Sequence, residues 1–287
     1  MLLIAIAGGG PVANAAWAQP LPEVPESVYE TPQLRSPGQG FNDGALHLDL
    51  SLRYATDYVF RGIEIVEPSS SEDALNGQVE AGLQFDLGRL PDPFVRIFTN
   101  SAEGDDVSNL QVIRPMVGLA WETEPFDLSL GHQTFTYPDR DDLNTNEVFA
   151  ELHFNDATLF GDEGRILGPY VMAAYDYDAF EGTYVELGLR REEQFGTTGL
   201  VVGVEGHVAY VDDYGGLFDA PDGDGGSGFQ HYQVGLFAHY ELNQLLNLSR
   251  RYGRWSITGQ LNYTDRIDND LRADTQLWGG VGITLRY

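Results

Sequence analysis

The chain has 287 residues, of which 44 are acidic and 16 basic, giving a formal net charge of −28 at pH 7. Every basic residue is arginine. This excess of carboxylates excludes binding to nucleic-acid phosphates, which requires clustered Lys and Arg. The absence of cysteine excludes disulfides and thiolate metal sites. The acidity fits a soluble surface, a surface that attracts cations, or both.

The start of the chain resembles an export signal, which we place at residues 1–18. Residues 2–7 are apolar, and Ala16 and Ala18 form the small-x-small pattern of a cleavage site. The basic stretch that usually opens such a signal is missing. Residues 19–43 are rich in Pro, Ser, Gln and Gly, which predicts an extended periplasmic arm or a plug.

Residues 46–60 (LHLDLSLRYATDYVF) alternate between apolar and polar side chains without interruption. A period of two predicts a β-strand with one apolar and one polar face. At about 3.3 Å per residue the strand would span roughly 50 Å, whereas ordinary strands have about 5–6 residues. This length predicts a strand that crosses a membrane at a tilt and projects beyond it.

The same alternation recurs along the chain. We predict twelve strands, at residues 45–60, 76–87, 93–100, 109–122, 125–137, 146–155, 166–177, 182–192, 198–211, 228–241, 253–265 and 274–287. Pro115 cannot donate to a ladder and predicts a bulge in the fourth strand. The first, third, fifth, ninth and eleventh connections are acidic, whereas the second, fourth and eighth are short.

Long alternating strands in even number, with acidic loops at one end, are typical of a transmembrane β-barrel. Lipid offers no hydrogen bonds to the backbone, so a spanning sheet must close on itself. We therefore predict an all-β fold: a twelve-stranded antiparallel transmembrane β-barrel over residues 44–287. Short turns would lie in the periplasm and longer acidic loops outside the cell. The alternative, a soluble β-sandwich, does not need strands of this length.

The polar face of each predicted strand should point into the barrel. The candidate lumen-lining residues are Arg53, Asp57, Arg61, Glu80, Arg96, Arg114, Glu147, Glu151, Glu186, Arg190 and Glu205. Asp57 and Arg61 lie four positions apart on one predicted face. We interpret them as an ion pair that fixes the first strand, because unpaired buried charges are costly; a constriction is the alternative.

No cofactor or metal site is predicted. Asp219, Asp222 and Asp224 lie among glycines in the ninth connection, but the spacing of an EF-hand Ca²⁺ loop is absent, which favours a solvated loop. No Ser-His-acid set can be assembled, which argues against an enzyme. Arg250 and Arg251 lie beside leucines in the tenth connection and fit either a plain basic turn or an amphipathic turn against lipid headgroups.

Residues 52–64 (LRYATDYVFRGIE) resemble the first-strand signature of the TorF family of porins, which is roughly T/S-D-Y-x-F/W-R-G-x-S. The matching residues are Thr56, Asp57, Tyr58, Phe60, Arg61 and Gly62. Glu64 stands where the family usually has Ser. The resemblance is confined to this stretch and implies a porin-like outer-membrane protein, with no solute implied.

The end of the chain, with Ile283, Leu285 and Tyr287 on one face, resembles the insertion signal read by the barrel-assembly machinery. The expected partners are outer-membrane lipid, that machinery during biogenesis, and small solutes or ions. The predicted function is passive diffusion of small hydrophilic solutes with a preference for cations, because acids outnumber arginines inside and at the mouth. The alternative is a non-conducting surface or scaffold barrel whose acidic loops bind cations or a partner.

Overall fold

The computed structural model describes residues 45–65, 75–103, 108–123, 125–138, 140–156, 167–195, 199–214, 218 and 226–287. The predicted export signal, the Pro-rich arm and the acidic cluster of the ninth connection lie outside these ranges. Within them, no helix has the length and apolar character needed to cross a membrane.

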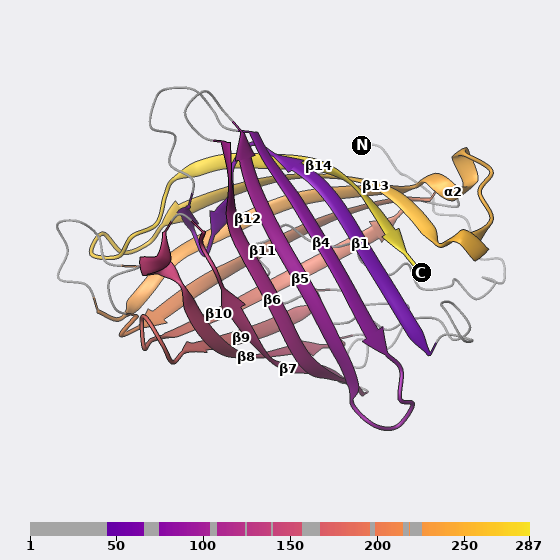
Figure 1. Ribbon diagram of the computed structural model, residues 1–287. Helices are drawn as coiled ribbons and strands as arrows, with labels where there is room; N and C mark the ends of the chain where they lie inside the picture. Colours follow the sequence, from indigo (N-terminus) through magenta and orange to yellow (C-terminus); the bar gives the residue numbers. More distant parts are fainter. Residues whose placement is uncertain are drawn as a thin grey trace, which may run out of the picture.

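A closed antiparallel barrel of twelve strands forms the body of the molecule (Figure 1). Each barrel strand pairs with the barrel strands before and after it in the chain, and β1 pairs with β14 to close the ring. The predicted fold class is confirmed, and all twelve predicted segments are strands. The barrel strands are β1 (Leu46–Ala55), β4 (Leu75–Phe85), β5 (Asp92–Glu103), β6 (Ser108–Glu122), β7 (Phe126–Phe135), β8 (Thr145–Phe154), β9 (Pro169–Asp176), β10 (Thr183–Gln194), β11 (Leu200–Asp212), β12 (Gly228–Glu241), β13 (Arg254–Arg266) and β14 (Gln276–Arg286).

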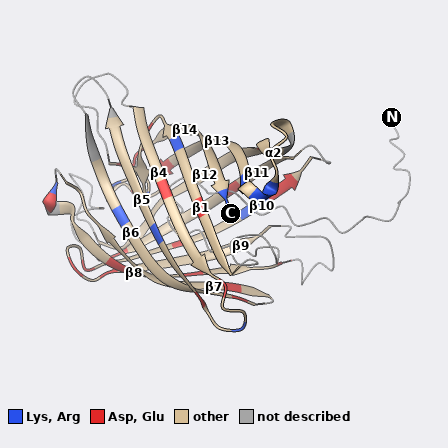
Figure 2. Ribbon diagram, turned by 45° about the vertical axis from the view of Figure 1, so that its right-hand side comes forward, with Lys and Arg blue, Asp and Glu red and all other residues tan. Residues whose placement is uncertain are grey.

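The barrel is apolar on its outside and polar on its inside. On β1, Arg53 is 6% exposed, whereas its neighbours Leu52 and Tyr54 are 51% and 62% exposed. On β12, Gln233 is buried and Leu236 is exposed. Charged residues interrupt several strands of the wall (Figure 2). Soluble proteins bury apolar side chains and expose polar ones, whereas this barrel does the reverse. The arrangement suits an outer face in lipid and an inner face in contact with polar groups.

Between β1 and β4 the chain folds into the barrel as a second, two-stranded sheet of β2 (Val59–Phe60) and β3 (Ile63–Glu64) (Figure 1). We call residues 58–65 the lumenal hairpin. The predicted strand over residues 46–60 is therefore too long, because β1 ends at Ala55. The hairpin is apolar on both faces and almost fully buried, so it packs inside the barrel instead of extending the wall.

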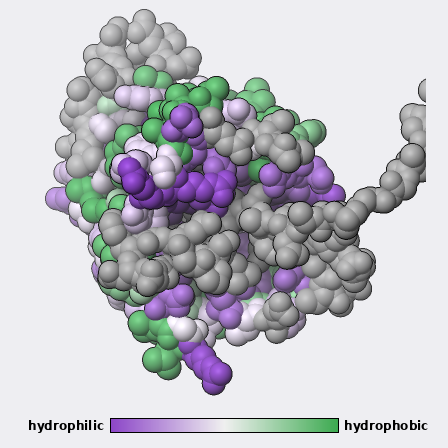
Figure 3. Space-filling model, turned by 90° about the vertical axis from the view of Figure 1, so that its right-hand side faces the viewer, coloured by the Kyte–Doolittle hydropathy of each residue, from purple (hydrophilic) through white to green (hydrophobic). Residues whose placement is uncertain are grey.

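The barrel has two different ends. The hairpin end holds the lumenal hairpin and the short 3-10 helix η2 (Asp141–Leu143). At the terminal end, where β1 begins and β14 finishes, α2 (Leu242–Leu245) and the 3-10 helix η3 (Arg250–Tyr252) connect β12 to β13. Figure 3 faces the terminal end, with green hydrophobic residues mostly toward the rim and purple hydrophilic residues both near the centre and at the edge.

Pro115 lies within β6, opposite Ile97 of β5. The ladder to β7 is continuous only from Met116 onward, with a separate bridge between Ile113 and Thr136. Pro115 thus interrupts the pairing with β7, as a residue without an N–H must. The prediction of a bulge at Pro115 is wrong. The irregularity in this part of the sheet lies elsewhere, where the register of β5 and β6 shifts between Asn100 and Ser101.

The outer face allows a direct test of its contact with lipid. We expect Leu236→Arg, in the interior of β12, to lower the free energy of unfolding by about 2–4 kcal/mol, because it places a charge near the bilayer midplane. Leu277→Arg, near the start of β14, should cost only about 0–1 kcal/mol, because the side chain can reach the interface. Unfolding in lipid vesicles measures both; equal costs at the two sites would contradict the depth assigned to them.

Candidate functional site in the barrel interior

The tip of the lumenal hairpin is a two-residue turn of Arg61 and Gly62, closed by the pairing of Phe60 with Ile63. Both turn residues have positive φ, 51° and 75°, as a type I′ hairpin turn requires. A Cβ on Gly62 would lie 2.7 Å from Cγ of His231 on the barrel wall. Glycine is therefore needed both for the backbone conformation and for the close approach of the tip to the wall.

Arg61 forms a buried ion pair with Glu147 on β8. Its Nη1 and Nη2 atoms donate to Oε1 and Oε2 of Glu147 at 2.7 and 2.8 Å. The two side chains are 0% and 1% exposed. Such a two-pronged contact is the strongest geometry available to a guanidinium and a carboxylate. It ties the hairpin tip to the far wall of the barrel.

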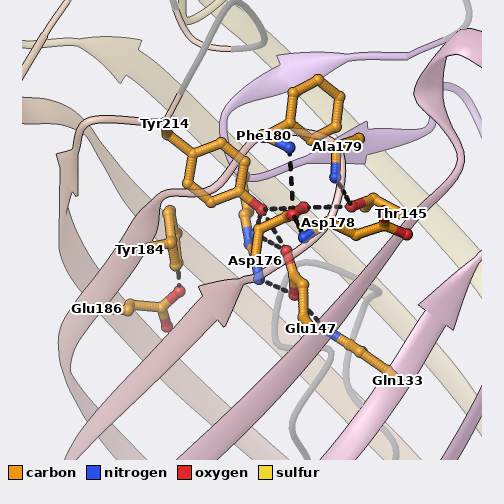
Figure 4. Close-up of polar contacts among 11 residues, drawn as sticks. Gln133, Thr145, Glu147, Asp176, Asp178, Ala179, Phe180, Tyr184, Glu186 and Tyr214 are labelled. Atoms are coloured by element: carbon orange, nitrogen blue, oxygen red, sulfur yellow. Dashed lines mark hydrogen bonds and ion pairs between the residues drawn. The ribbon is translucent and has the colours of Figure 1, made fainter.

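Glu147 belongs to a larger polar network (Figure 4). Gln133 Nε2 donates to it at 2.6 Å, and the Tyr214 hydroxyl donates to it as well. The same hydroxyl lies 3.4 Å from Oδ2 of Asp176, which also accepts from Thr145 Oγ1 at 2.6 Å. Burial raises the pKa of Tyr214 well above its usual value, so the hydroxyl keeps the proton that it donates.

Backbone groups of the hairpin are anchored to two further places in the barrel. Gln230 Nε2, at the start of β12, donates to the carbonyl oxygen of Arg61 at 3.0 Å. Before β14, the backbone N–H of Asp274 donates to the carbonyl oxygen of Gly62 at 2.7 Å, and its carboxylate accepts from Glu64 N–H at 2.8 Å. The hairpin is thus held on three sides of the ring.

Aromatic side chains fill the space around the hairpin. The Arg61 guanidinium lies 4.4 Å from the ring centre of Tyr184 and 4.8 Å from that of Phe60. Phe60 in turn packs on Phe135, with ring centres 5.2 Å apart. These residues belong to one buried apolar cluster that also includes Tyr58, Ile63, Phe98, Tyr137, Tyr214, Phe218 and Leu271. The lumen at the hairpin end is therefore packed with side chains.

The predicted ion pair between Asp57 and Arg61 is wrong. Arg61 pairs with Glu147, while Oδ2 of Asp57 accepts from Thr56 Oγ1 at 2.6 Å. The prediction assumed that both residues continue the first strand. Because β1 ends at Ala55 and the chain turns inward, Asp57 stays at the entrance of the hairpin while Arg61 reaches its tip.

Toward the terminal end, Glu151 and Glu186 form a second cluster with histidine and tyrosine. Glu151 lies 2.5 Å from Nε2 of His153. Glu186 accepts from the Tyr170 hydroxyl at 2.5 Å and lies 3.5 Å from Nδ1 of His207. These carboxylates are buried beside imidazole and phenol groups, with no arginine hydrogen-bonded to either among the described residues.

Arg190 contacts two acids of the same region, the predicted Glu205 and Glu192, which was not predicted. It lies 2.7 Å from Oε1 of Glu192 and 3.3 Å from Oε2 of Glu205, and its guanidinium stacks 4.0 Å from the ring centre of Phe237. The aromatic ring covers one face of the guanidinium, which leaves its edge for the two carboxylates.

The remaining predicted arginines lie on β1, β5 and β6. Arg96 is 3.9 Å from Glu80, a loose contact. Nη1 of Arg53 lies 3.5 Å from Oε1 of Gln78. Arg114 is 1% exposed and lies against Phe98, 4.7 Å from its ring centre.

Sequence reasoning missed the residues that hold the hairpin, among them Tyr214, Gln230 and Asp274. They come from loops and strand ends, where alternation carries no information about contacts. One local signal was available: Val59, Phe60 and Ile63 are apolar on both faces of the segment. Continuous apolar residues indicate burial on both sides, which a strand in the wall of a membrane barrel does not have.

The closed ring, apolar exterior and charged interior define a transmembrane β-barrel of the kind found in outer membranes. No protein-family profile matches the chain, and no curated protein matches it by sequence. The resemblance of residues 52–64 to the TorF family therefore stays a prediction, and most of that stretch lies in the lumenal hairpin instead of a first strand.

Solved structures similar to this chain include barrels of comparable length. The KdgM porin has 9% identity and a TM-score of 0.47, covering 83% of this chain and 98% of its own. A NanC porin in a rhombohedral crystal form has 9% identity and a TM-score of 0.48, with the same coverage. The COG4313 outer membrane channel from Pseudomonas putida F1 has 11% identity and a TM-score of 0.47, covering 89% of this chain and 100% of its own.

Proposed function

We propose that this protein is an outer-membrane channel for passive diffusion of small hydrophilic solutes, with the lumenal hairpin as its narrowest part. The observation that carries the proposal is the polar interior of a closed barrel whose outer face is apolar. Charged side chains such as Glu151, Glu186 and Arg190 inside the ring offer water and polar solutes a path that lipid does not.

The predicted lumen-lining residues form the proposed path. Arg96, Glu80, Arg190 and Glu205 lie between the hairpin and the terminal end, and Arg61 and Glu147 lie at the hairpin itself. This arrangement along the barrel axis supports two zones: a charged vestibule toward the terminal end and a packed constriction at the lumenal hairpin.

We also propose that the channel prefers cations. Among the described residues that are buried, Arg53, Arg61 and Arg114 are outnumbered by six acids, namely Asp127, Glu147, Glu151, Asp156, Asp176 and Glu186. This count supports an excess of carboxylates in the interior, and the whole chain carries a net charge of −28. Negative charge along a path concentrates counter-ions there.

The expected result is a reversal potential that shows selectivity for K⁺ across a planar bilayer under a KCl gradient. The selectivity should fade as salt rises, because the Debye length shrinks from about 10 Å at 0.1 M to about 3 Å at 1 M. A preference for Cl⁻ at low salt would contradict the electrostatic argument without affecting the assignment as a channel.

The packed hairpin end favours a second candidate, a non-conducting surface or scaffold barrel. Tyr58, Phe60 and Ile63 are at most 3% exposed inside the ring. Single-channel recording of the purified protein and of Glu147→Gln separates the two functions. Conductance of the wild type supports a channel, whereas a wild type that is silent despite correct insertion would support the scaffold. Conductance of Glu147→Gln alone would show that the hairpin closes the native barrel.

A further inference from the structure

Arg114 is a buried lumenal arginine that the network around Glu147 does not use. It lies on β6 opposite Phe98 of β5, and its side chain is 1% exposed. Its guanidinium lies 4.7 Å from the ring centre of Phe98 and 5.6 Å from that of Phe135. Two aromatic rings thus hold the cationic group at the hairpin end of the barrel.

Two donor atoms of Arg114 have no partner among the residues that the structure describes. Among the described residues, Nε and Nη1 are buried without a hydrogen-bond partner. Arg61 shows the contrast, since Glu147 accepts from both of its terminal nitrogens. A buried guanidinium without acceptors is costly, and none of the described residues provides an acceptor to Nε or Nη1, which leaves these two donors for a bound partner.

A second unused group lies on the neighbouring strand. Asn100 is fully buried, its Nδ2 donates to Oδ1 of Asn76 at 3.0 Å, and its own Oδ1 has no partner among the described residues. Asn100 pairs with Val112, two positions before Arg114, which makes Asn100 and Arg114 diagonal neighbours at about 7–8 Å between Cα atoms. The site therefore offers donors from Arg114 and an acceptor from Asn100.

We propose that Arg114 and Asn100 bind a small hydroxycarboxylate. The carboxylate would accept from the guanidinium, and its hydroxyl would donate to Oδ1 of Asn100. Tyr58 of the lumenal hairpin packs on Phe98, with ring centres 5.8 Å apart, and Phe98 packs on Arg114, so the hairpin lies next to these groups. The assignment rests on the proposed function in that a solute must enter the lumen. A bound anion neutralises Arg114 and leaves the acids of β8 to β11 to set the cation preference.

Equilibrium binding tests this proposal independently of conduction. Lactate is titrated into the purified full-length protein in detergent, with sodium chloride keeping the ionic strength constant, and the thermal unfolding midpoint is read. We expect a saturable rise in the midpoint for the wild type and an apparent dissociation constant at least about tenfold weaker for Arg114→Gln. Arg250→Gln is the matched control, because Arg250 is exposed at the terminal end, and it should respond like the wild type.

Each other outcome has a defined meaning. Equal titrations of the wild type and Arg114→Gln, or no saturable effect in the wild type, would overturn the site. An equal response to chloride would overturn the carboxylate class. If Arg114→Gln does not fold, Arg114→Lys keeps the charge but loses the planar guanidinium, and weaker saturable binding is then expected. Lactate binding by a protein that never conducts would leave this site standing and contradict only the proposed channel.

Discussion

Glu147→Gln is expected to destabilise the barrel and increase its conductance. The substitution leaves the Arg61 guanidinium buried without a counter-charge, because the two side chains are 0% and 1% exposed. Removing one partner of such a pair costs about 3–5 kcal/mol. The hairpin can escape this cost by leaving the lumen, which places Arg61 in water and removes the packed constriction. The unfolding midpoint and single-channel conductance measure the two effects.

Two further variants separate release of the hairpin from general damage. Glu193→Gln breaks an ion pair with Arg191 at 3.3 Å whose side chains are 48% and 64% exposed. We expect it to cost about 0–1 kcal/mol and to leave conductance unchanged. Arg61→Met with Glu147→Met removes both buried charges, and we expect most of the stability and the low conductance to return. Lower stability of Glu147→Gln with unchanged conductance would show that the hairpin does not close the path.

The barrel was predictable from sequence because its two environments are so different. Each strand separates lipid from the lumen, so alternation of apolar and polar residues marks both the strand and its orientation. On β1, the predicted outward residues Leu52 and Tyr54 are exposed and the predicted inward residue Arg53 is buried. Tyr58 and Phe60, which continue the same predicted face, are buried in the lumenal hairpin instead. Closure follows from the need to pair every edge, and neighbouring strands in the chain are neighbours in the ring.

The interior was predictable only in part. The odd or even position of a residue along a strand shows which way its side chain points, but not which residue it contacts. Arg61 and Glu147 were both predicted to face the lumen, yet they are 86 residues apart and their pairing depends on the hairpin folding inward. Residues 56–60 continue the alternating pattern of β1 in sequence, although they do not belong to that strand. The apolar residues on both faces of this segment carried the opposite signal, and that signal agrees with the structure.

The turn at Gly62 provides the second large effect. Gly62→Val should release the lumenal hairpin, because φ is +75° and a Cβ would meet the His231 ring at 2.7 Å. A left-handed backbone costs a residue with a side chain about 1–2 kcal/mol, and the contact with His231 adds to that strain. We expect a lower unfolding midpoint and a higher conductance, similar to those of Glu147→Gln.

Gly88→Val is the matched control for this substitution. Gly88 has nearly the same backbone conformation, with φ of +74°, but a Cβ there would meet nothing within 4 Å. It should therefore show the cost of backbone strain alone, with unchanged conductance. If Gly62→Val and Glu147→Gln both act by releasing the same hairpin, the double variant should conduct like either single variant, because a released hairpin cannot be released again. Additive increases in conductance would show instead that the two residues restrict the lumen independently.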